Sequence, residues 1–174
     1  MHDKRPAQRT RLIANALLFQ LGWWAIVLTH NLYSLFIIAI YLAVHFWLLA
    51  EHRVREAVFI ALATCLGALV DLLWFKLGIL QAEGGYPLWL LALWPLFLST
   101  LYHSLAWLGG QWLWAALLGA VFAPLSYWGG VAFTPVSFAD PWLSTLALGA
   151  FWLVYLPACF KFKQYLSAST AFRF

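Results

Sequence analysis

Long apolar stretches separated by short polar ones dominate the hydrophobic pattern of this 174-residue chain. Residues 12–50 contain no Asp, Glu, Lys or Arg, and neither do residues 84–139. One helical crossing of a hydrocarbon core takes about 20 residues, so each stretch is long enough for two crossings. We divide the first at His30-Asn31 and the second at Gly109-Gly110-Gln111. The whole pattern predicts six helices, at roughly 12–29, 32–50, 57–80, 86–108, 111–134 and 142–162.

Composition changes this picture from a helical domain to a membrane domain. Hydrophobic residues make up 65% of the chain and charged residues 9%, with a mean hydropathy of +0.84. Soluble domains are about half apolar and roughly a quarter charged, so this chain lacks the polar surface that water requires. We therefore expect an all-α, polytopic membrane helix bundle that forms a single domain over residues 1–174.

The distribution of charge predicts how the bundle is oriented. With six spans, nine of the ten basic residues fall on one side, and the opposite loops carry Glu83 and Asp140. Because cytoplasmic loops are enriched in Lys and Arg, we expect both termini in the cytoplasm. A net charge of +4 spread in this way forms no nucleic-acid patch, so no nucleic-acid partner is expected. The nine residues are Lys4, Arg5, Arg9, Arg11, Arg53, Arg55, Lys161, Lys163 and Arg173.

Ionisable side chains within the spans are the strongest candidates for chemistry, because hydrocarbon does not hydrate them. Asp71, near the middle of the third span, can serve as a proton carrier, a general base or a ligand anchor, or can hold two helices together. His103, in the fourth span, can act as an acid–base catalyst or a ligand donor. Counted from the span centres, the two residues differ in depth by more than about 10 Å, at 1.5 Å per residue. We therefore expect no direct pair between them.

Other polar residues are expected to face the bundle interior beside these two. His45 lies at a depth similar to that of His103, and Asn15 and Ser104 are expected to share that depth. Trp94 lies deep enough to line an apolar cavity. Ser126 follows Pro124 and precedes Gly129-Gly130, which predicts an irregular helix of the kind that serves packing or a mid-membrane site. The candidate ligand-binding set is Asn15, Gln20, His45, Asp71, Trp94, His103, Ser104 and Ser126.

Several sequence motifs that would assign an enzyme class are missing. The sequence contains no HExxH, GxSxG or CxxC motif and no Gly-rich phosphate loop followed by lysine. Cys65 and Cys159 both lie in apolar runs, which supports neither a disulfide framework nor a zinc site with four ligands. We therefore expect no metal or organic cofactor. A metal site built from His45, His103 and Asp71 is the least favoured alternative.

Several short segments resemble a family of small bacterial inner-membrane proteins known only as a domain of unknown function. The segments span nearly the whole chain, from Asn15 and Phe19-Gln20-Leu21-Gly22-Trp23 to Gly119 with Pro124-Leu125-Ser126-Tyr127-Trp128-Gly129. Between them lie Gly67 with Asp71, Pro87-Leu88-Trp89-Leu90, Trp94-Pro95-Leu96-Phe97 and, as the most specific part, Leu101-Tyr102-His103-Ser104-Leu105. Tyr102 departs from the family pattern, where an Asn is frequent.

The resemblance implies a multi-pass protein of the bacterial inner membrane, and it also suggests a biological setting. Members of the family are often encoded near methyltransferases of the cyclopropane-fatty-acid-synthase type and near flavin-dependent oxidases. This association implies a pathway of membrane-lipid metabolism or oxidative stress. Membrane lipids, and enzymes of lipid metabolism, are the partners it suggests.

Three functions of different classes follow from these observations. The favoured one is a protein that binds a lipid or another hydrophobic ligand. The alternatives are an intramembrane lipid-modifying enzyme that uses His103 and Asp71, and a small proton-coupled transporter that uses Asp71. A closed pocket that opens sideways to lipid would favour binding, an acid–base pair within hydrogen-bond reach would favour the enzyme, and a water-accessible path to Asp71 would favour transport.

Overall fold

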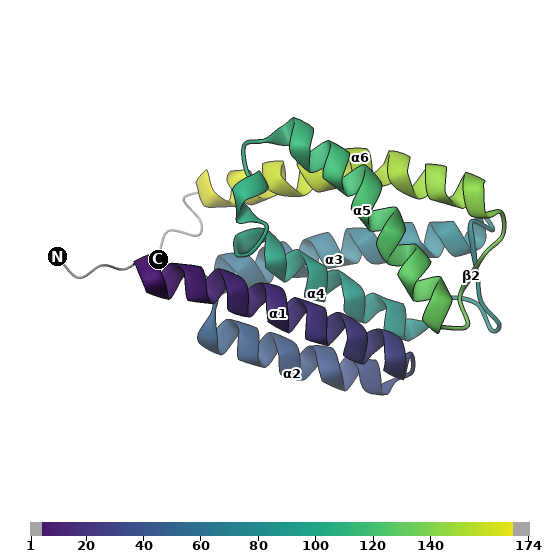
Figure 1. Ribbon diagram of the computed structural model, residues 1–174, viewed down its shortest axis with the longest axis horizontal. Coiled ribbons are helices and arrows are strands. Elements are labelled where there is room, and N and C mark those ends of the chain that lie inside the picture. The colour runs from purple at the N-terminus through teal and green to yellow at the C-terminus, as the bar shows by residue number, and fades with distance from the viewer. Residues whose placement is uncertain (1–4, 169–174) are drawn as a thin grey trace.

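The computed structural model describes residues 5–168 as a bundle of antiparallel helices (Figure 1). Three short 3-10 helices, η1 (Leu88–Ala92), η2 (Ser99–Tyr102) and η3 (Ala106–Leu108), lie along the fourth segment. The all-α class predicted from the sequence is confirmed. Over the described residues the α-helices are α1 (Arg5–Thr29), α2 (Tyr33–Leu48), α3 (Arg53–Lys76), α4 (Leu93–Leu98), α5 (Trp112–Phe133) and α6 (Pro141–Ala168).

The two helix boundaries predicted inside the long apolar stretches are confirmed. Between α1 and α2, His30 has a φ of 31°, and the Asn31 side-chain oxygen accepts a hydrogen bond from the Tyr33 backbone N–H at 2.8 Å. Asparagine closes such turns because its side chain can take the place of a backbone acceptor. The second boundary is a left-handed Gly110, with a φ of 89°, just before α5.

The third and fourth predicted helices differ from the structure. The third was expected to reach residue 80, but α3 ends at Lys76 because Gly78 adopts a left-handed φ of 71°. A two-residue strand β1 (Leu80–Gln81) follows and pairs antiparallel with β2 (Ser137–Phe138). The pairing links the connection after α3 to the connection after α5.

The fourth segment is not the single helix predicted over 86–108. It winds as η1, α4 and η2, and then turns at His103 before η3. The side chains of Ser99 and Thr100 donate to carbonyls three residues earlier, at 2.8 and 2.6 Å, and the Thr100 carbonyl accepts from the N–H of Leu105. These bonds favour 3-10 winding and end the helix. Pro124, where an irregular helix was expected, lies inside α5, which is assigned as one continuous helix over 112–133.

The length and composition of the helices indicate an integral membrane protein. Among residues 5–168, four helices are long and apolar enough to cross a membrane: Gln8–Thr29, Arg53–Lys76, Trp112–Phe133 and Pro141–Ala168. Tyr33–Leu48 and Leu88–Tyr102 are shorter apolar segments. The outer surface carries large exposed apolar side chains on these helices, as a lipid-facing surface requires.

The ends of the helices give the bundle two chemically different ends. α1 and α3 begin, and α6 finishes, at the same end (Figure 1), which we call the basic end. It carries Arg9, Arg11, Arg53, Arg55, Lys161 and Lys163, whereas the other end carries the β1–β2 pair, Glu83, Asp140 and one basic residue, Lys76, at the end of α3. Lys4 and Arg173 lie outside the described residues, and only the backbone of Arg5 is described.

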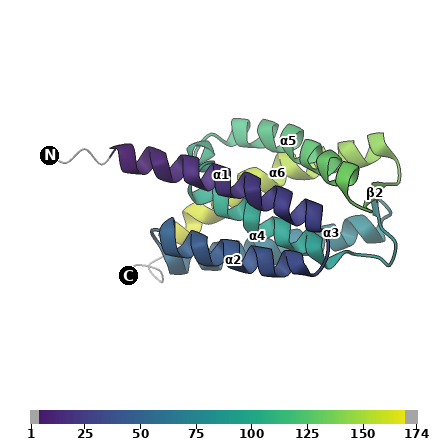
Figure 2. The ribbon, with the colours of Figure 1, turned by 60° about the horizontal axis from the view of Figure 1, so that its bottom comes forward.

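The short fourth segment forms the centre around which the long helices pack. α4 contacts α1, α2 and α3, and in both views it lies inside the bundle (Figures 1 and 2). α5 packs along α6 but crosses obliquely over α4, so that it approaches α1 near the β2 end and diverges from it toward the basic end (Figure 1). Some side chains of the fourth segment, among them Leu93, Phe97 and Leu105, line a cavity together with residues of α1 and α5.

Candidate functional site

Two buried carboxylates lie on one face of α3. The buried positions of this helix recur at the helical spacing, so they form a continuous stripe toward the core. Glu56 stands in the first turn and Asp71 near the last turns, and each is only 1% exposed. Because burying a carboxylate without partners is costly, the partners of these two side chains define the candidate sites.

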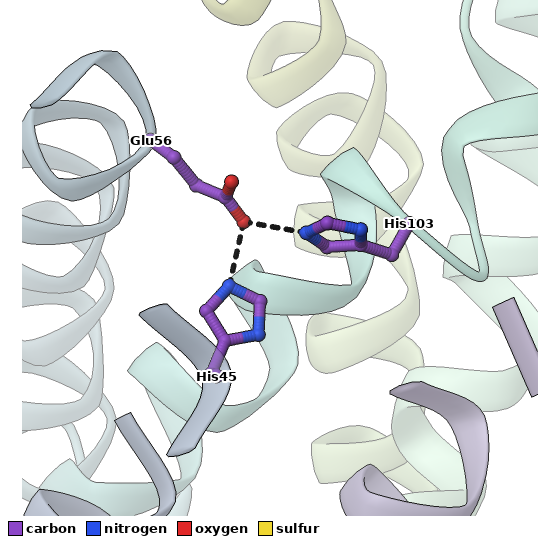
Figure 3. Close-up of side chains that lie close together, drawn as sticks. All are labelled: His45, Glu56 and His103. Carbon is purple, nitrogen blue, oxygen red and sulfur yellow. Dashed lines mark hydrogen bonds and ion pairs between the residues drawn. The ribbon is translucent and has the colours of Figure 1, made fainter. Parts of the chain in front are cut away.

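Glu56 is held by two imidazoles (Figure 3). Its Oε1 atom lies 2.7 Å from Nε2 of His45, near the end of α2, and 2.9 Å from Nε2 of His103. Both rings point their Nε2 atoms at the same oxygen, and their centroids are 5.0 Å apart. The short α2–α3 connection brings His45 to Glu56, and the turn after η2 directs His103 toward them. We call His45, Glu56 and His103 the histidine–glutamate cluster.

Ring packing, in addition to hydrogen bonding, fixes the position of His45. The ring is fully buried, lies parallel to Tyr41 and meets Phe46 edge to face. Its Nδ1 atom has no hydrogen-bond partner among residues 5–168. The Tyr41 hydroxyl is itself held at 2.7 Å from Oγ of Ser99. His45 therefore makes its side-chain hydrogen bond through Nε2, to Glu56.

The histidine–glutamate cluster reaches the surface through a small polar cavity at the basic end. His103 and Glu56 line this cavity of about 130 Å³ together with polar side chains at its rim. His103 is 8% exposed, whereas His45 is 0% exposed. At the rim, Arg11 forms an exposed ion pair with Glu51 at 3.0 Å. Water at this end therefore has a route to His103.

Asp71 forms a second polar centre with aromatic donors. Nε1 of Trp94, in α4, donates to Oδ2 at 2.6 Å, and the Tyr127 hydroxyl, in α5, donates to Oδ1 at 3.0 Å. The three residues come from three different helices, so the carboxylate joins α3, α4 and α5. We call Asp71, Trp94 and Tyr127 the aspartate centre.

A glycine makes the aspartate centre sterically feasible. Gly67 lies one turn before Asp71, and a Cβ atom there would collide with the Trp94 ring. On its other side, Trp94 stacks on Trp152 of α6 with centroids 5.4 Å apart and planes 5° apart. The indole is thus clamped between α3 and α6, which aims its N–H at Asp71.

The aspartate centre forms part of the wall of a large cavity. The volume is about 840 Å³, and the lining is mainly apolar, drawn from α1, the fourth segment, α5 and α6. Its polar members include Asp71, Thr100 and Ser104. A cavity of this size with a few polar groups matches the general form of small-molecule sites, which measure roughly 300–1,000 Å³.

The cavity opens between α1 and α5. The exposed side chains that line it include Gln20 on α1 and Phe122, Leu125 and Ser126 on α5. Trp23 of α1 bridges the two helices by donating from Nε1 to Oγ of Ser126 at 3.2 Å. The opening lies along the side of the bundle, where the outer surface is apolar.

The structure divides the predicted site residues between these places. Asp71, Trp94, Ser104, Ser126 and Gln20 all line the large cavity. Gln20, however, is exposed at the opening, whereas the sequence suggested the bundle interior. His45 and His103 meet in the histidine–glutamate cluster, as their depths suggested. Asp71 and His103 belong to different clusters, in agreement with their predicted separation.

Asn15 joins the fourth segment to α1. It is fully buried, and its Oδ1 atom accepts hydrogen bonds from the Ser104 hydroxyl at 2.7 Å and from the Ser104 backbone N–H at 3.2 Å. The structure thus brings Asn15 to Ser104, and His103 is the preceding residue of the same turn. Asn15 stabilises the turn that carries His103, and it does not line the large cavity.

Sequence reasoning missed Glu56 and Tyr127. The predicted third span began at residue 57, which left Glu56 in a basic loop. A signal was nevertheless present, because Glu56 stands at helical spacing from Phe59, Ile60 and Ala63, on the face that becomes buried. Tyr127 carried no signal of this kind, since its partner Asp71 is 56 residues away in the chain.

Comparisons with known proteins identify a family but no activity. A family model described as "Protein of unknown function (DUF2878)" matches residues 12–158. Neither the curated proteins nor the solved structures include a match to the chain. The function must therefore be argued from the two polar centres and the cavities beside them.

Proposed function

We propose that this chain, which belongs to the DUF2878 family of proteins of unknown function, is an integral membrane protein that binds a lipid or another hydrophobic ligand. The observation that carries the proposal is the mainly apolar cavity of about 840 Å³ with the Asp71 carboxylate in its wall. An acyl chain or similar group would occupy the apolar part. Asp71 would accept a hydrogen bond from a hydroxyl or amine of the ligand.

The chemistry of Asp71 supports this role. A carboxylate has about four lone-pair directions, and Trp94 and Tyr127 use two of them. Capacity therefore remains for a donor that enters the cavity. The two aromatic donors fix the orientation of the carboxylate in advance, which lowers the ordering cost of binding.

The proposed setting is a bacterial inner membrane, crossed six times with both termini in the cytoplasm. Support for the orientation comes from the basic end, which holds the described Lys and Arg residues of α1, α3 and α6 except Lys76. In this arrangement the opening between α1 and α5 faces the acyl chains. Membrane lipids would be the ligands, and enzymes of lipid metabolism would supply or use them.

An intramembrane enzyme is the second candidate function, and the histidine–glutamate cluster favours it. A carboxylate and two imidazoles within 2.7 to 2.9 Å are groups that can move protons. Catalysis by His103 together with Asp71 gains no support, because the two residues have different partners. Proton-coupled transport is less favoured, because Asp71 faces a mainly apolar cavity.

The test is to fill the cavity without disturbing the bundle. Gly130 lines the cavity, and a Cβ atom there would have no atom within 4 Å, so Gly130→Leu adds bulk into open space. Native mass spectrometry of protein purified in a mild detergent should show a retained lipid in the unmodified chain. The same spectrum of Gly130→Leu should show at least a several-fold loss of that lipid.

The matched control is Val121→Phe, at an exposed position of the same helix that does not line the cavity. This variant should retain as much lipid as the unmodified chain. Binding of a dansyl-labelled long-chain alcohol gives a second readout, which Asp71→Asn should weaken by about 10- to 100-fold if the alcohol donates to the carboxylate. Equal lipid retention and equal probe binding in all variants would exclude the cavity as the binding site.

A further inference from the structure

We propose that His45, Glu56 and His103 bind a divalent first-row transition-metal ion, with Zn²⁺ as the ion to test. Each residue offers one ligand atom, and these three atoms lie within 4.8 Å of one another. They come from α2, α3 and the turn after η2, and they converge on one point (Figure 3). The proposal concerns a site apart from the large cavity, which none of the three residues lines.

The donor set matches the chemistry of such ions. Two imidazole nitrogens and one carboxylate oxygen are ligands that Zn²⁺ uses, and sites with three protein ligands leave a fourth position for water or substrate. The same set, with open positions, also binds Fe²⁺ in non-haem iron proteins. Zn²⁺ binds such N and O ligands more tightly than Fe²⁺ does, which makes it the more sensitive probe.

The ligand atoms already stand near the spacing that an ion requires. Two ligand atoms bound tetrahedrally at about 2.0–2.2 Å from an ion are about 3.4 Å apart. The Nε2–Oε1 separations here are 2.7 and 2.9 Å. An ion would therefore replace the two hydrogen bonds once each Nε2–Oε1 pair lengthens by about 0.5–0.7 Å. The two imidazole nitrogens lie within 4.8 Å of each other, and side-chain rotations of the histidines would set their spacing around the ion.

Charge also favours an ion at this place. A buried carboxylate is stable when a positive charge or several hydrogen bonds compensate it, and Glu56 is 1% exposed. The positive charge of a divalent cation would compensate the Glu56 carboxylate, so neither histidine would need to be protonated. The ring contacts of His45 with Tyr41 and Phe46 hold Nε2 toward the ion position, the role that an outer hydrogen bond often plays.

An ion can enter from the basic end of the bundle. The small cavity of about 130 Å³ joins Glu56 and His103 to the exposed residues Glu51 and His52. The ion would not need to cross the apolar interior, and water in the cavity could take the fourth position. The sequence analysis expected no metal and kept only a least favoured site with Asp71 in it, because it did not identify Glu56 as a buried residue beside the two histidines.

The experiment uses the full chain, purified in detergent with a tag that contains no histidine. After treatment with a chelator, the protein is titrated with Zn²⁺ by calorimetry and with Co²⁺ by visible absorption. We expect one Zn²⁺ per chain, a Co²⁺ spectrum of a site with nitrogen and oxygen ligands, and a thermal midpoint that rises with Zn²⁺. Glu56→Gln and His103→Gln each remove a ligand, so each should weaken Zn²⁺ binding by more than the about 10- to 100-fold that loss of an outer partner costs.

Glu51→Gln and His52→Gln are the matched controls, since both residues line the small cavity outside the cluster. These variants should bind Zn²⁺ as the unmodified chain does. Loss of binding in the controls, with retention in Glu56→Gln, would place the ion at the rim and overturn the proposal. If the ligand variants do not elute as folded protein, the test rests on the unmodified chain. Binding of less than one Zn²⁺ per chain, with no change in its thermal midpoint, then overturns the proposal.

Lipid retention by the large cavity is measured in a separate experiment. A negative result at one of the two sites therefore does not contradict the proposal for the other.

Discussion

The two carboxylates of α3 show how one functional group meets different partners in different surroundings. Asp71 accepts hydrogen bonds from an indole and a phenol, and it borders a large apolar cavity. Glu56 meets two imidazoles, and it borders a small polar cavity at the basic end. Fifteen residues separate them, roughly 22 Å along the helix at 1.5 Å per residue.

The difference in partners decides what each centre can do. The indole and the phenol act here as hydrogen-bond donors, so they fix the Asp71 carboxylate in place. An imidazole can donate or accept a hydrogen bond, gain a proton or bind a metal ion. The aspartate centre therefore has the groups to orient a ligand, as proposed, whereas the histidine–glutamate cluster has the groups for the proposed ion or proton chemistry.

The largest loss of stability is expected when both imidazoles of the histidine–glutamate cluster are removed. The double variant His45→Ala/His103→Ala leaves the Glu56 carboxylate buried without these partners, which should lower the free energy of unfolding by about 3–5 kcal/mol. Reversible unfolding in detergent measures the change. His52→Ala, at an exposed position of the same end, should change it by less than about 0.5 kcal/mol.

Replacing His45, Glu56 and His103 together by leucine tests whether the unpaired Glu56 charge causes this loss of stability. A well-packed apolar cluster often matches or exceeds the stability of a buried charged one, so the triple variant should recover most of the lost free energy. A triple variant as unstable as the double one would mean that the cluster shapes the bundle by packing. In that case, the unpaired charge would not explain the loss.

A smaller loss of unfolding free energy is expected when the packing of the aspartate centre is disturbed. In Gly67→Ala, the added methyl group would push Trp94 away from α3 and from Asp71, costing about 1–3 kcal/mol of unfolding free energy. Gly130→Ala is the control, because its added methyl group meets open space and should be neutral or slightly stabilising. Thermal unfolding of the two variants, side by side, measures the difference. Equal midpoints would contradict the close contact between Gly67 and Trp94.

The smallest effect is expected at the rim of the small cavity. The Arg11–Glu51 ion pair has side chains that are 50% and 70% exposed. Exposed pairs contribute about 0–1 kcal/mol, so Glu51→Gln should shift the free energy of unfolding by no more than that. The shift should shrink further in high salt, which screens exposed charges. A loss as large as that of the double histidine variant would show that the pair is part of the cluster.

Much of the fold could be predicted from the sequence, because a helix that crosses a membrane requires a long apolar run of residues. The breaks at His30-Asn31 and Gly110 were visible as turn residues. The 3-10 winding of the fourth segment was not, since it depends on side-chain bonds of Ser99 and Thr100 to nearby carbonyls. The β1–β2 pair was also hidden, because it joins two connections that lie far apart in the chain.

The site was predictable only where a polar residue stood alone in an apolar run. Asp71 and His103 were visible for that reason. Glu56 was hidden among Arg53 and Arg55, and only its spacing from the buried residues of α3 pointed inward. Which polar residues meet was beyond the sequence, because it depends on how α5 crosses α4 and on where the fourth segment turns.

The distances along the chain within each centre have a consequence for assembly during synthesis. His45 and Glu56 are separated by 11 residues, so they can meet once the α2–α3 hairpin has been made. Asp71 must wait for Trp94, 23 residues later, and for Tyr127, 56 residues later. Since chains are made from the N-terminus, a nascent chain that ends after α3 already contains one imidazole partner of Glu56, while neither aromatic partner of Asp71 has been made.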